Sequence, residues 1–480
     1  GELNGGGESN GSMVRNFLAE FDSPTKLKVV EAHDQGAVVI NVGSSRFHHY
    51  PRLYKVPLDQ RRANPHAYSP FLFSFGPYHA YPPDCPLLAH ALLDGAHLKR
   101  MTASALILSD TQLSTLFHSI QQLEPQIRAQ YVQWLDGGTS DFGPLARILA
   151  LDAITIVAAT FSHHQLQRHQ SPLIYPLARL VLSDAMLLEN QVPVILLESA
   201  LKTIAQNGAT SPGDLQGKSQ LRPGADDPLP SLEDVILWYC KRSSPFPEWT
   251  LHKLPPLEDK AKGEPLLSFL YDYVSDRLTQ SPHSDHDQGC LPIKSPMIDA
   301  DPSLPTALQL SKSGVRFRPC DTGDIRFDEE DDVLLLPRIT VSDTTVRVLH
   351  NLLAYEATLR HPEQYTIISY VHFLDCLIDN VDDVHILTES GIICNKLGSH
   401  EELAKMWNKL CMYVSCRNTV SNRMVMAQLD ALSKQKWRQW RASFVETYWE
   451  KQPWLLLSIF AAMVLFVLSL LQTIYTILAY

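Results

Sequence analysis

Two short stretches of this sequence gather side chains of the types that enzymes use. The first is SFGPYH, which places Ser74 and His79 close together along the chain. A hydroxyl beside an imidazole suggests a nucleophile with its general base, but catalytic partners usually meet through the fold rather than along the chain. We therefore expect Gly76 and Pro77 to form a turn, with Tyr78 and the neighbouring aromatic rings packed on helices.

The second stretch, DAMLLENQVPVILLES, carries two acids and two amides among apolar residues. Apolar side chains would lie on both sides of a helix here, which predicts burial. Pro193 lacks an N–H and clashes with the carbonyl four residues earlier, so the helix should kink or restart. Asn190 and Gln191 have amide donors for the freed carbonyl, and Asp184 and Glu189 can accept bonds from backbone or from a basic side chain. We expect this cluster to fix a helix break in the core and to take no part in catalysis.

A third group of acids, Asp379, Asp382 and Asp383, lies near His385. Carboxylates beside an imidazole suit hydrolysis by general acid–base catalysis. Acids that cap the start of a helix explain the same pattern. Both interpretations are open from the sequence.

Metal and cofactor motifs are weak in this chain. The stretch from His283 to Asp287 offers metal-type ligands but lies in a Pro- and Ser-rich linker, and the acidic run from Phe327 to Asp332 lacks the glycine and spaced oxygens of an EF-hand. The sequence contains no GxSxG, GxxxxGK[ST], HExxH or GxGxxG motif in the required context. We assign no catalytic, cofactor-binding or metal-binding residue and expect no cofactor.

The longest apolar run, LLLSIFAAMVLFVLSLLQTIYTILA, covers residues 455–479 with Gln472 as its one strongly polar side chain. As a helix it would extend roughly 37 Å, enough to cross about 30 Å of hydrocarbon with some tilt. This predicts a transmembrane anchor over residues 453–480, with the lipid bilayer as partner through residues 455–479. A buried core helix is the alternative.

Basic residues before the anchor indicate its orientation. No basic residue follows the span, whereas five precede it: Lys434, Lys436, Arg438, Arg441 and Lys451. The positive-inside rule then places the body in the cytosol, with the opposite topology as the alternative and the plasma membrane as a candidate location. Residues 1–44 read as a flexible leader without the apolar core of a signal peptide, so insertion after translation is expected.

Composition limits the partners. With 480 residues, of which 45% are hydrophobic, the chain can bury substantial cores. A net charge of −11 argues against nucleic acid as the main partner, because phosphate binding needs a basic face. Eight cysteines without a CxxC pair suit free thiols in a reducing compartment.

Hydrophobic periodicity predicts a mostly helical domain over residues 45–452, with loop insertions near 207–230, 244–265 and 281–306. Helices are expected over residues 87–108, from Asp110 through 135, and over 145–161, 173–204, 232–241, 266–278 and most of 344–440. Alternating β-formers at 314–318, 324–327 and 332–341 predict a small antiparallel β insert. The expected class is therefore mainly α.

Several of these motifs together resemble a known family. They are, in order, YPRLYKVP, AYSPFLFSFGPYH, LEPQIRAQY, DAMLLENQVPVILLE, ALQLSKSGVRFRP, TVRVLHNLLAYE, YVHFLDCLIDNVDDVHILTESGII and YWEKQPWLLLSIFAA. The order and spacing are similar to the plant family called domain of unknown function 247, over about residues 50–480. The family usually has glycine where this chain has Tyr81 and Ala153, which weakens turn arguments at those two positions.

The resemblance implies a plant-specific single-pass membrane protein without established catalysis. It also implies, for some grass members, a role as pollen-side determinants of self-incompatibility. We expect a non-enzymatic recognition or signalling component that binds an unidentified protein partner. A membrane-anchored hydrolase using Asp and His residues is the alternative, and a structural membrane scaffold is a third interpretation.

Overall fold

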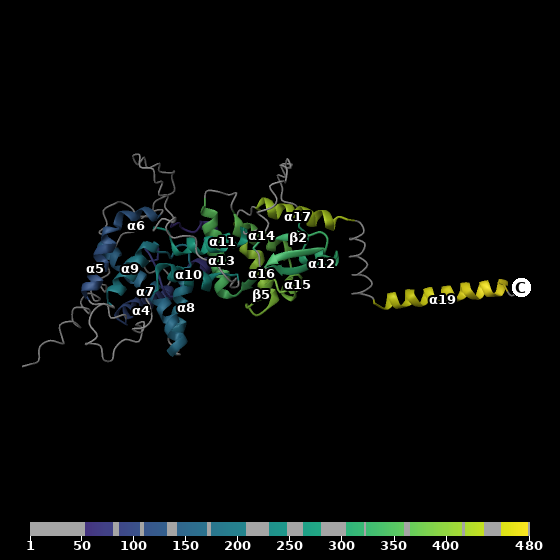
Figure 1. Cartoon of the computed structure of the whole chain (residues 1–480), viewed down its shortest axis with the longest axis horizontal. Coiled ribbons are helices and arrows are strands. Elements are labelled where there is room, and N and C mark those ends of the chain that lie inside the picture. Colours follow the sequence, from purple (N-terminus) through teal and green to yellow (C-terminus); the bar gives the residue numbers. More distant parts are fainter. Residues whose placement is uncertain are drawn as a thin grey trace, which may run out of the picture. The chain divides into compact units, whose positions relative to one another are not determined.

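Helices dominate the structure, a computed structural model of the whole chain (Figure 1). Its described residues also contain five short strands, which confirms the mainly α class with a small sheet and an apolar C-terminal helix. The described residues are 53–79, 86–105, 110–131, 142–169, 174–207, 230–246, 263–279, 304–320, 323–359, 365–414, 418–435 and 453–478. The predicted leader, most of the three loop insertions, the histidine-rich spot at 283–287 and the basic residues at 436–451 lie outside them.

The chain divides into two compact units. The first runs to Asp276 and adds Asp343–Arg360, and the second comprises Arg277–Ser342 and the residues from His361 onward. In the first unit the helices are α2 (Leu58–Ala63), α3 (Pro65–Tyr68), α4 (Pro86–Ala105), α5 (Asp110–Gln122), α6 (Glu124–Gln130), α7 (Gly143–His169), α8 (Ile174–Ala185), α9 (Val194–Asn207), α10 (Leu232–Ser243), most of α11 (Leu266–Thr279), and α13 (Asp343–Thr358).

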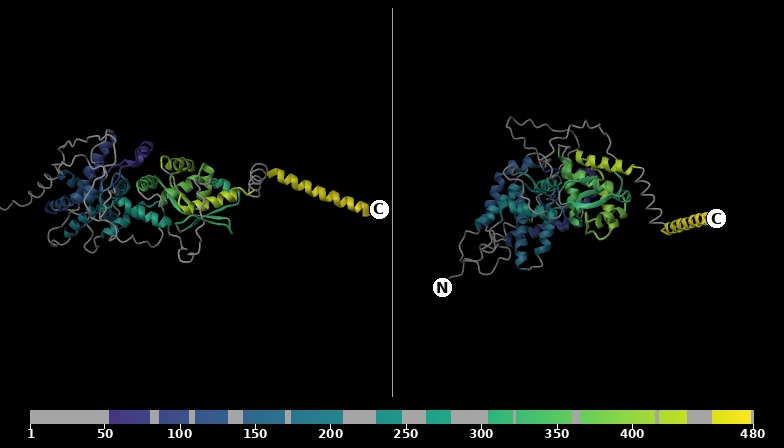
Figure 2. Two further views of the ribbon diagram at one scale, coloured as in Figure 1. Left: turned by 90° about the horizontal axis from the view of Figure 1, so that it is seen from above. Right: turned by 45° about the vertical axis from the view of Figure 1, so that its right-hand side comes forward.

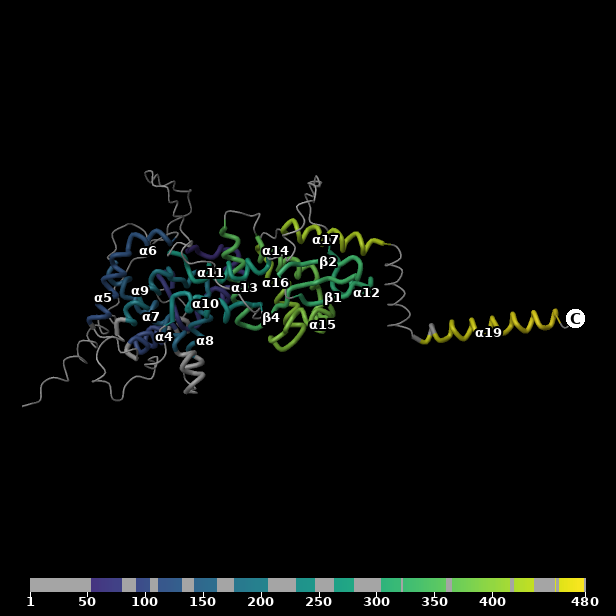
Figure 3. The backbone as a smooth tube through the Cα atoms, viewed as in Figure 1, coloured from purple at the N-terminus to yellow at the C-terminus, as the bar shows by residue number. Residues whose placement is uncertain are grey.

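Helix α7 forms the centre of the first unit. Every residue from Leu151 to Phe161 is buried, because α7 is apolar on all sides and packs against α4, α5, α8 and α9. Figure 3 shows its backbone beside those of α8 and α9. The apolar run with a single internal acid, Asp152, is therefore a core helix.

The helix predicted from Asp110 through residue 135 is wrong as a single helix. Helix α5 ends at Gln122 and α6 begins at Glu124. Pro125 explains the break, since its ring would clash with the carbonyl of Gln121 if α5 continued. Pro125 is tolerated in the first turn of α6, where N–H groups have no helical acceptor. Helix α6 ends at Gln130, and the glycine pair at 137–138 lies outside the described residues.

The second unit combines short helices with two small sheets. Its helices are α12 (Ala307–Lys312), α14 (Thr366–Leu377), α15 (Val381–Glu389), α16 (His400–Leu410) and α17 (Val420–Ser433), and its strands are β1 (Arg316–Cys320), β2 (Arg326–Asp328), β3 (Val333–Pro337), β4 (Ile339–Val341) and β5 (Ile393–Asn395). Figure 2 shows α17 beside these strands, in agreement with its contacts to β2.

The pairing of these strands is mixed rather than wholly antiparallel. Strand β3 lies between β1 and β2, parallel to β1 and antiparallel to β2, and β4 pairs in parallel with β5. The tight turn at residues 329–332 makes β2 and β3 a hairpin, so β1 takes the other edge of β3. The acidic run is this exposed turn, and β5 escaped prediction because it is three residues long within a helical pattern.

Helix α19 (Pro453–Leu478) is long and apolar enough to cross a membrane. By length and hydropathy, Gly143–Phe161 within α7 could also cross a membrane, but 78% of that window is buried in the protein. In the window Leu457–Leu478 of α19 the buried share is 0%. Only α19 among the described helices combines this length and composition with full exposure.

Candidate functional site

The first candidate motif lies in the extended segment, residues 69–79, which follows α3 and has no regular secondary structure. Phe73 and Phe75 are nevertheless fully buried, and so are Gly76 and Pro77. Buried backbone N–H and C=O groups need hydrogen-bond partners, and this segment belongs to no helix or sheet whose backbone would supply them. The partners are side chains from α4, α7, α8, α13 and the break after α8.

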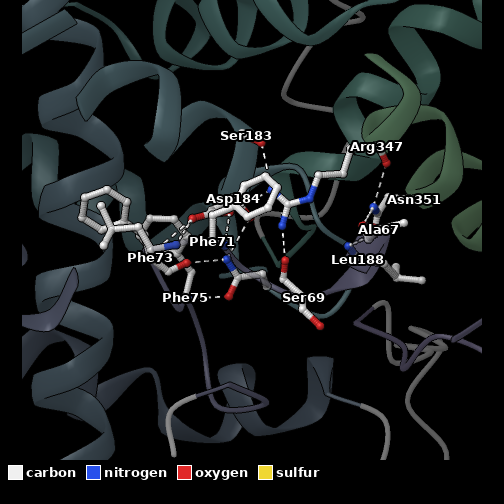
Figure 4. Close-up of polar contacts among 12 residues, drawn as sticks. Ala67, Ser69, Phe71, Phe73, Phe75, Ser183, Asp184, Leu188, Arg347 and Asn351 are labelled. Atoms are coloured by element: carbon white, nitrogen blue, oxygen red, sulfur yellow. Dashed lines mark hydrogen bonds and ion pairs between the residues drawn. The ribbon is translucent and has the colours of Figure 1, made fainter. Parts of the chain in front are cut away.

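Asp184, at the end of α8, binds three consecutive amides of the extended segment. Its Oδ1 accepts from the N–H of Phe71 and its Oδ2 from those of Leu72 and Phe73, each at 2.9 Å. The carboxylate also receives Nη1 of Arg347 at 3.1 Å, and its side chain is fully buried. Figure 4 shows both sets of contacts converging on this carboxylate.

Arg347 on α13 holds the start of the segment. Its guanidinium donates to the carbonyl of Ser69 and to Oγ of Ser183 at 2.9 Å, and it lies 3.8 Å from the centre of the Phe71 ring. Burial lowers the pKa of Arg347, and the Asp184 carboxylate opposes that effect. One turn later, Asn351 accepts from the N–H of Leu188 at 2.8 Å and donates to the carbonyl of Ala67 at 2.9 Å.

Asn190 and Gln191 lie in residues 186–193, which separate α8 from α9. The helix break was predicted at Pro193, but α8 already ends at Ala185. The Asn190 amide accepts from the N–H of Phe75 at 2.6 Å and donates to the carbonyls of Phe73 and Asp184, each at 2.8 Å. Gln191 donates to the carbonyls of Ala185 and Leu187 and accepts from the N–H of Leu267 at 3.0 Å. The two amides thus cap the open end of α8, and Asn190 also binds the extended segment.

An ion pair from α4 and α7 holds the middle of the segment. Lys99 Nζ lies 2.5 Å from Oδ1 of Asp152 and donates to the carbonyl of Ser74, while Oδ2 accepts from the N–H of Gly76 at 2.9 Å. Burial raises the pKa of Asp152, and Lys99 counteracts it. Both side chains are almost fully buried.

Glu189 and His79 form a more open part of the cluster. Glu189 accepts from the N–H of Val56 at 2.7 Å and pairs with Arg61, and burial raises its pKa against the effect of Arg61. His79 Nε2 lies 3.7 Å from Oε2 of Glu189. Burial, followed by the charges of Arg61 and Arg347, lowers the pKa of His79 to about 3, so its imidazole is neutral at physiological pH.

The SFGPYH motif forms the expected turn. Gly76 has a φ of +69°, Tyr78 Oη donates to the carbonyl of Leu53 at 3.0 Å, and the Tyr78 ring meets that of Tyr131 edge to face. No hydrogen bond joins Ser74 to His79 in the described part of the chain. A serine nucleophile with a histidine base is therefore not assembled here.

The structure brings the two candidate motifs into one cluster. The backbone N–H groups of Phe73, Phe75 and Gly76 donate to Asp184, Asn190 and Asp152, respectively. Pro193 pairs with Pro265 in an isolated bridge at the start of α9. Backbone groups occupy the acids and amides, and such an arrangement is suited to positioning a segment rather than to turning over a substrate.

The acids near His385 have separate environments. Asp383 is buried, accepts from the N–H groups of Leu308, Asp379 and Asn380, and completes a capping box at the start of α15. Asp382 and His385 are exposed, and His385 lies 3.3 Å from Glu389. Among the described residues no group of three metal-type ligands is close enough to hold an ion.

Several residues of the cluster escaped the sequence analysis. Lys99, Arg347 and Asn351 lie on helices outside both motifs, and only a charged or polar side chain inside an apolar pattern marked them. A further constellation is in the second unit, where Cys376 Sγ lies 3.8 Å from His372 Nε2 and His372 Nδ1 lies 3.2 Å from Asn418 Oδ1. Cys376 is in the last turn of α14 and so lacks the position at a helix N-terminus that activates cysteine nucleophiles.

We predict that Asn190→Leu lowers the free energy of unfolding by on the order of 1–3 kcal/mol, because it leaves buried backbone groups without partners. Denaturation of the purified chain in detergent measures this change. The control is Asn408→Leu, which removes an exposed bond to the carbonyl of Asp379 and should stay within about 0.5 kcal/mol of the wild type. An Asn190→Leu chain with unchanged stability but lost partner binding would instead make this a functional site.

We also predict that Gly76→Ala destabilises the chain more than Gly391→Ala. Both glycines have a similar positive φ, +69° and +75°, so the backbone strain is matched. A Cβ at Gly76 would lie 2.4 Å from the Gln191 carbonyl oxygen, whereas at Gly391 the nearest atom is 4.0 Å away. The clash should make the loss of unfolding free energy about 1–3 kcal/mol larger for Gly76→Ala than for Gly391→Ala. Equal losses for the two variants would contradict the close packing of the segment.

His350 gives a pH prediction. Burial lowers its pKa to about 4, and its Nε2 accepts from the Asn64 amide at 3.3 Å. Because the unfolded chain binds this proton near pH 6.5, the neutral histidine's contribution is complete above that pH and is lost as the pH falls toward about 4. His350→Phe should reduce the slope of unfolding free energy over this range by up to about 1.4 kcal/mol per pH unit, with no change in slope between pH 7 and 8. Identical slopes for the wild type and His350→Phe between about pH 4 and 6.5 would refute this prediction.

Comparison with known proteins agrees with the motifs. A family model described as plant protein of unknown function, domain of unknown function 247, matches residues 53–468. A putative UPF0481 protein of Arabidopsis thaliana is 23% identical over 92% of this chain and 91% of its own length. A second UPF0481 protein from the same plant is 24% identical over 89% of this chain and 86% of its own. No solved structure matches the chain. The extended segment and its partners lie within the matched residues, and the chain belongs to this family of plant proteins of unknown function.

Proposed function

We propose that this chain is a single-pass membrane protein whose cytosolic body serves in recognition or signalling without chemistry of its own. The observation that carries the proposal is α19, whose window Leu457–Leu478 has no charged residue and 0% burial in the protein. An uncharged helix of that length exposed to water would be strongly unfavourable, and a bilayer is the solvent that suits it.

The orientation rests on the residues before the helix. Basic side chains precede α19. The positive-inside rule favours a cytosolic body, and the described cysteines are all free, which suits a reducing compartment.

The non-catalytic part of the proposal rests on the cluster of the first unit. Asp184, Asn190 and Asp152 bind backbone N–H groups of the extended segment. The other bonds that they make are also to groups of the protein, which supports a structural role for them. A body without a catalytic site would act through its surface, so we propose a protein as its partner. Pollen-side self-incompatibility is one setting that the family resemblance proposes for it.

Removing residues 453–480 should move the body from the membrane fraction to the soluble fraction, because α19 supplies the long exposed apolar surface. Fractionation after a high-salt wash measures this, with deletion of residues 1–44 as the control that should leave the chain on membranes. A truncated chain that still pellets after the wash would contradict the single anchor.

Protease added outside sealed, right-side-out cells should leave the body intact, because the proposed orientation places it in the cytosol. Digestion of the body under these conditions would show the opposite orientation.

A further inference from the structure

The polar residues of α19 fall on one side of the helix. At about 100° per residue, Ser458, Ser469, Gln472, Thr473 and Thr476 all lie within about 60° of one line. The opposite side carries large apolar side chains and Tyr475, with Phe460, Val467 and Ile474 near its centre. Chance placement in an otherwise uniform lipid-facing helix would scatter these polar groups around the axis.

Spacing along this line is regular. We define the polar seam as the positions that alternate by four and three residues: Ser458, Ala462, Leu465, Ser469, Gln472 and Thr476. Each four-plus-three pair of steps spans seven residues, and this heptad spacing is the one with which two helices pack along a shared seam in a left-handed coil. The small side chains at Ser458, Ala462 and Ser469 allow two backbones to approach closely.

Gln472 supplies the independent reason for a partner. The hydroxyl of Thr476 donates to the Gln472 carbonyl at 2.7 Å and that of Thr473 to the Ser469 carbonyl at 2.8 Å, so these groups are satisfied within the helix. The Gln472 side-chain amide has no such bond in the described part of the chain. An amide facing hydrocarbon without a partner is costly, and it favours association with another helix.

We propose that α19 pairs with α19 of a second copy of this chain through the polar seam. An amide has both a donor and an acceptor, so Gln472 of one copy complements Gln472 of the other. Copies inserted with the same orientation place these residues at the same depth, and a two-fold axis then brings them face to face. This inference rests on the proposed function, because it requires α19 to lie in a membrane.

The test uses the full chain in membranes, with single cysteines introduced into the seam or opposite it. Ser469→Cys should form a disulfide-linked dimer on mild oxidation, whereas Val467→Cys, at nearly the same depth on the far side, should stay at the level of the unmodified chain. Equal cross-linking of the two variants, or cross-linking of Ser469→Cys only to other proteins, would overturn the pairing.

Gln472→Leu tests the amide itself. Energy transfer between copies fused to donor and acceptor fluorophores should show an association constant about three- to thirtyfold lower, the range expected for one interhelical hydrogen bond in a membrane. The matched control Leu470→Gln combined with Gln472→Leu keeps the composition but turns the amide to the far side, and it should fail to restore pairing through the seam. Unchanged association of Gln472→Leu would overturn the proposal.

Carbonate extraction of the same membranes separates the two claims. Variants that resist extraction but no longer pair retain the anchor and confirm the role of the seam. If carbonate extracted the unmodified chain from the membranes, that result would contradict the membrane anchor and therefore also the proposed pairing.

Discussion

The first unit depends on one constraint: the extended segment is buried although it belongs to no helix or sheet. The extended segment carries Phe73 and Phe75 into the core, and their burial removes water from the amides and carbonyls around them. Each of these groups would cost free energy if unpaired. Polar side chains of α4, α7, α8, α13 and the break after α8 therefore act as partners for this one stretch of chain.

This constraint also explains the break between α8 and α9. If that helix continued, Asn190 and Gln191 would project at helical spacing and could not turn back to the carbonyls of Asp184 and Ala185. Helix α8 ends at Ala185, eight residues before Pro193, so the proline sets the start of α9 at Val194 rather than the end of α8. The two amides cap the open end of α8, and Asn190 also binds Phe73 and Phe75.

Local rules predicted much of the fold. Periodicity predicted most helices, and Pro193 predicted the break, because both signals act over a few residues. Pro125 carried a similar signal that the apolar stripe around it obscured. The mixed pairing of β1 and β3 and the convergence of Lys99, Arg347 and Asn351 on the segment were not predictable, since contacts between residues far apart in the chain leave no local pattern. The turn at Gly76 and Pro77 and the packing of nearby aromatic rings on helices were predicted, but the hydrogen-bond partners of the extended segment emerged only from the three-dimensional arrangement.

Hydrogen exchange of the backbone amides in the extended segment tests the central claim most directly. If buried side chains hold this segment, the amides of Phe71, Leu72, Phe73, Phe75 and Gly76 should exchange as slowly as those of core helix α7, although none belongs to a helix or strand. Exchange at the rate of an exposed loop while α7 stays protected would contradict the account.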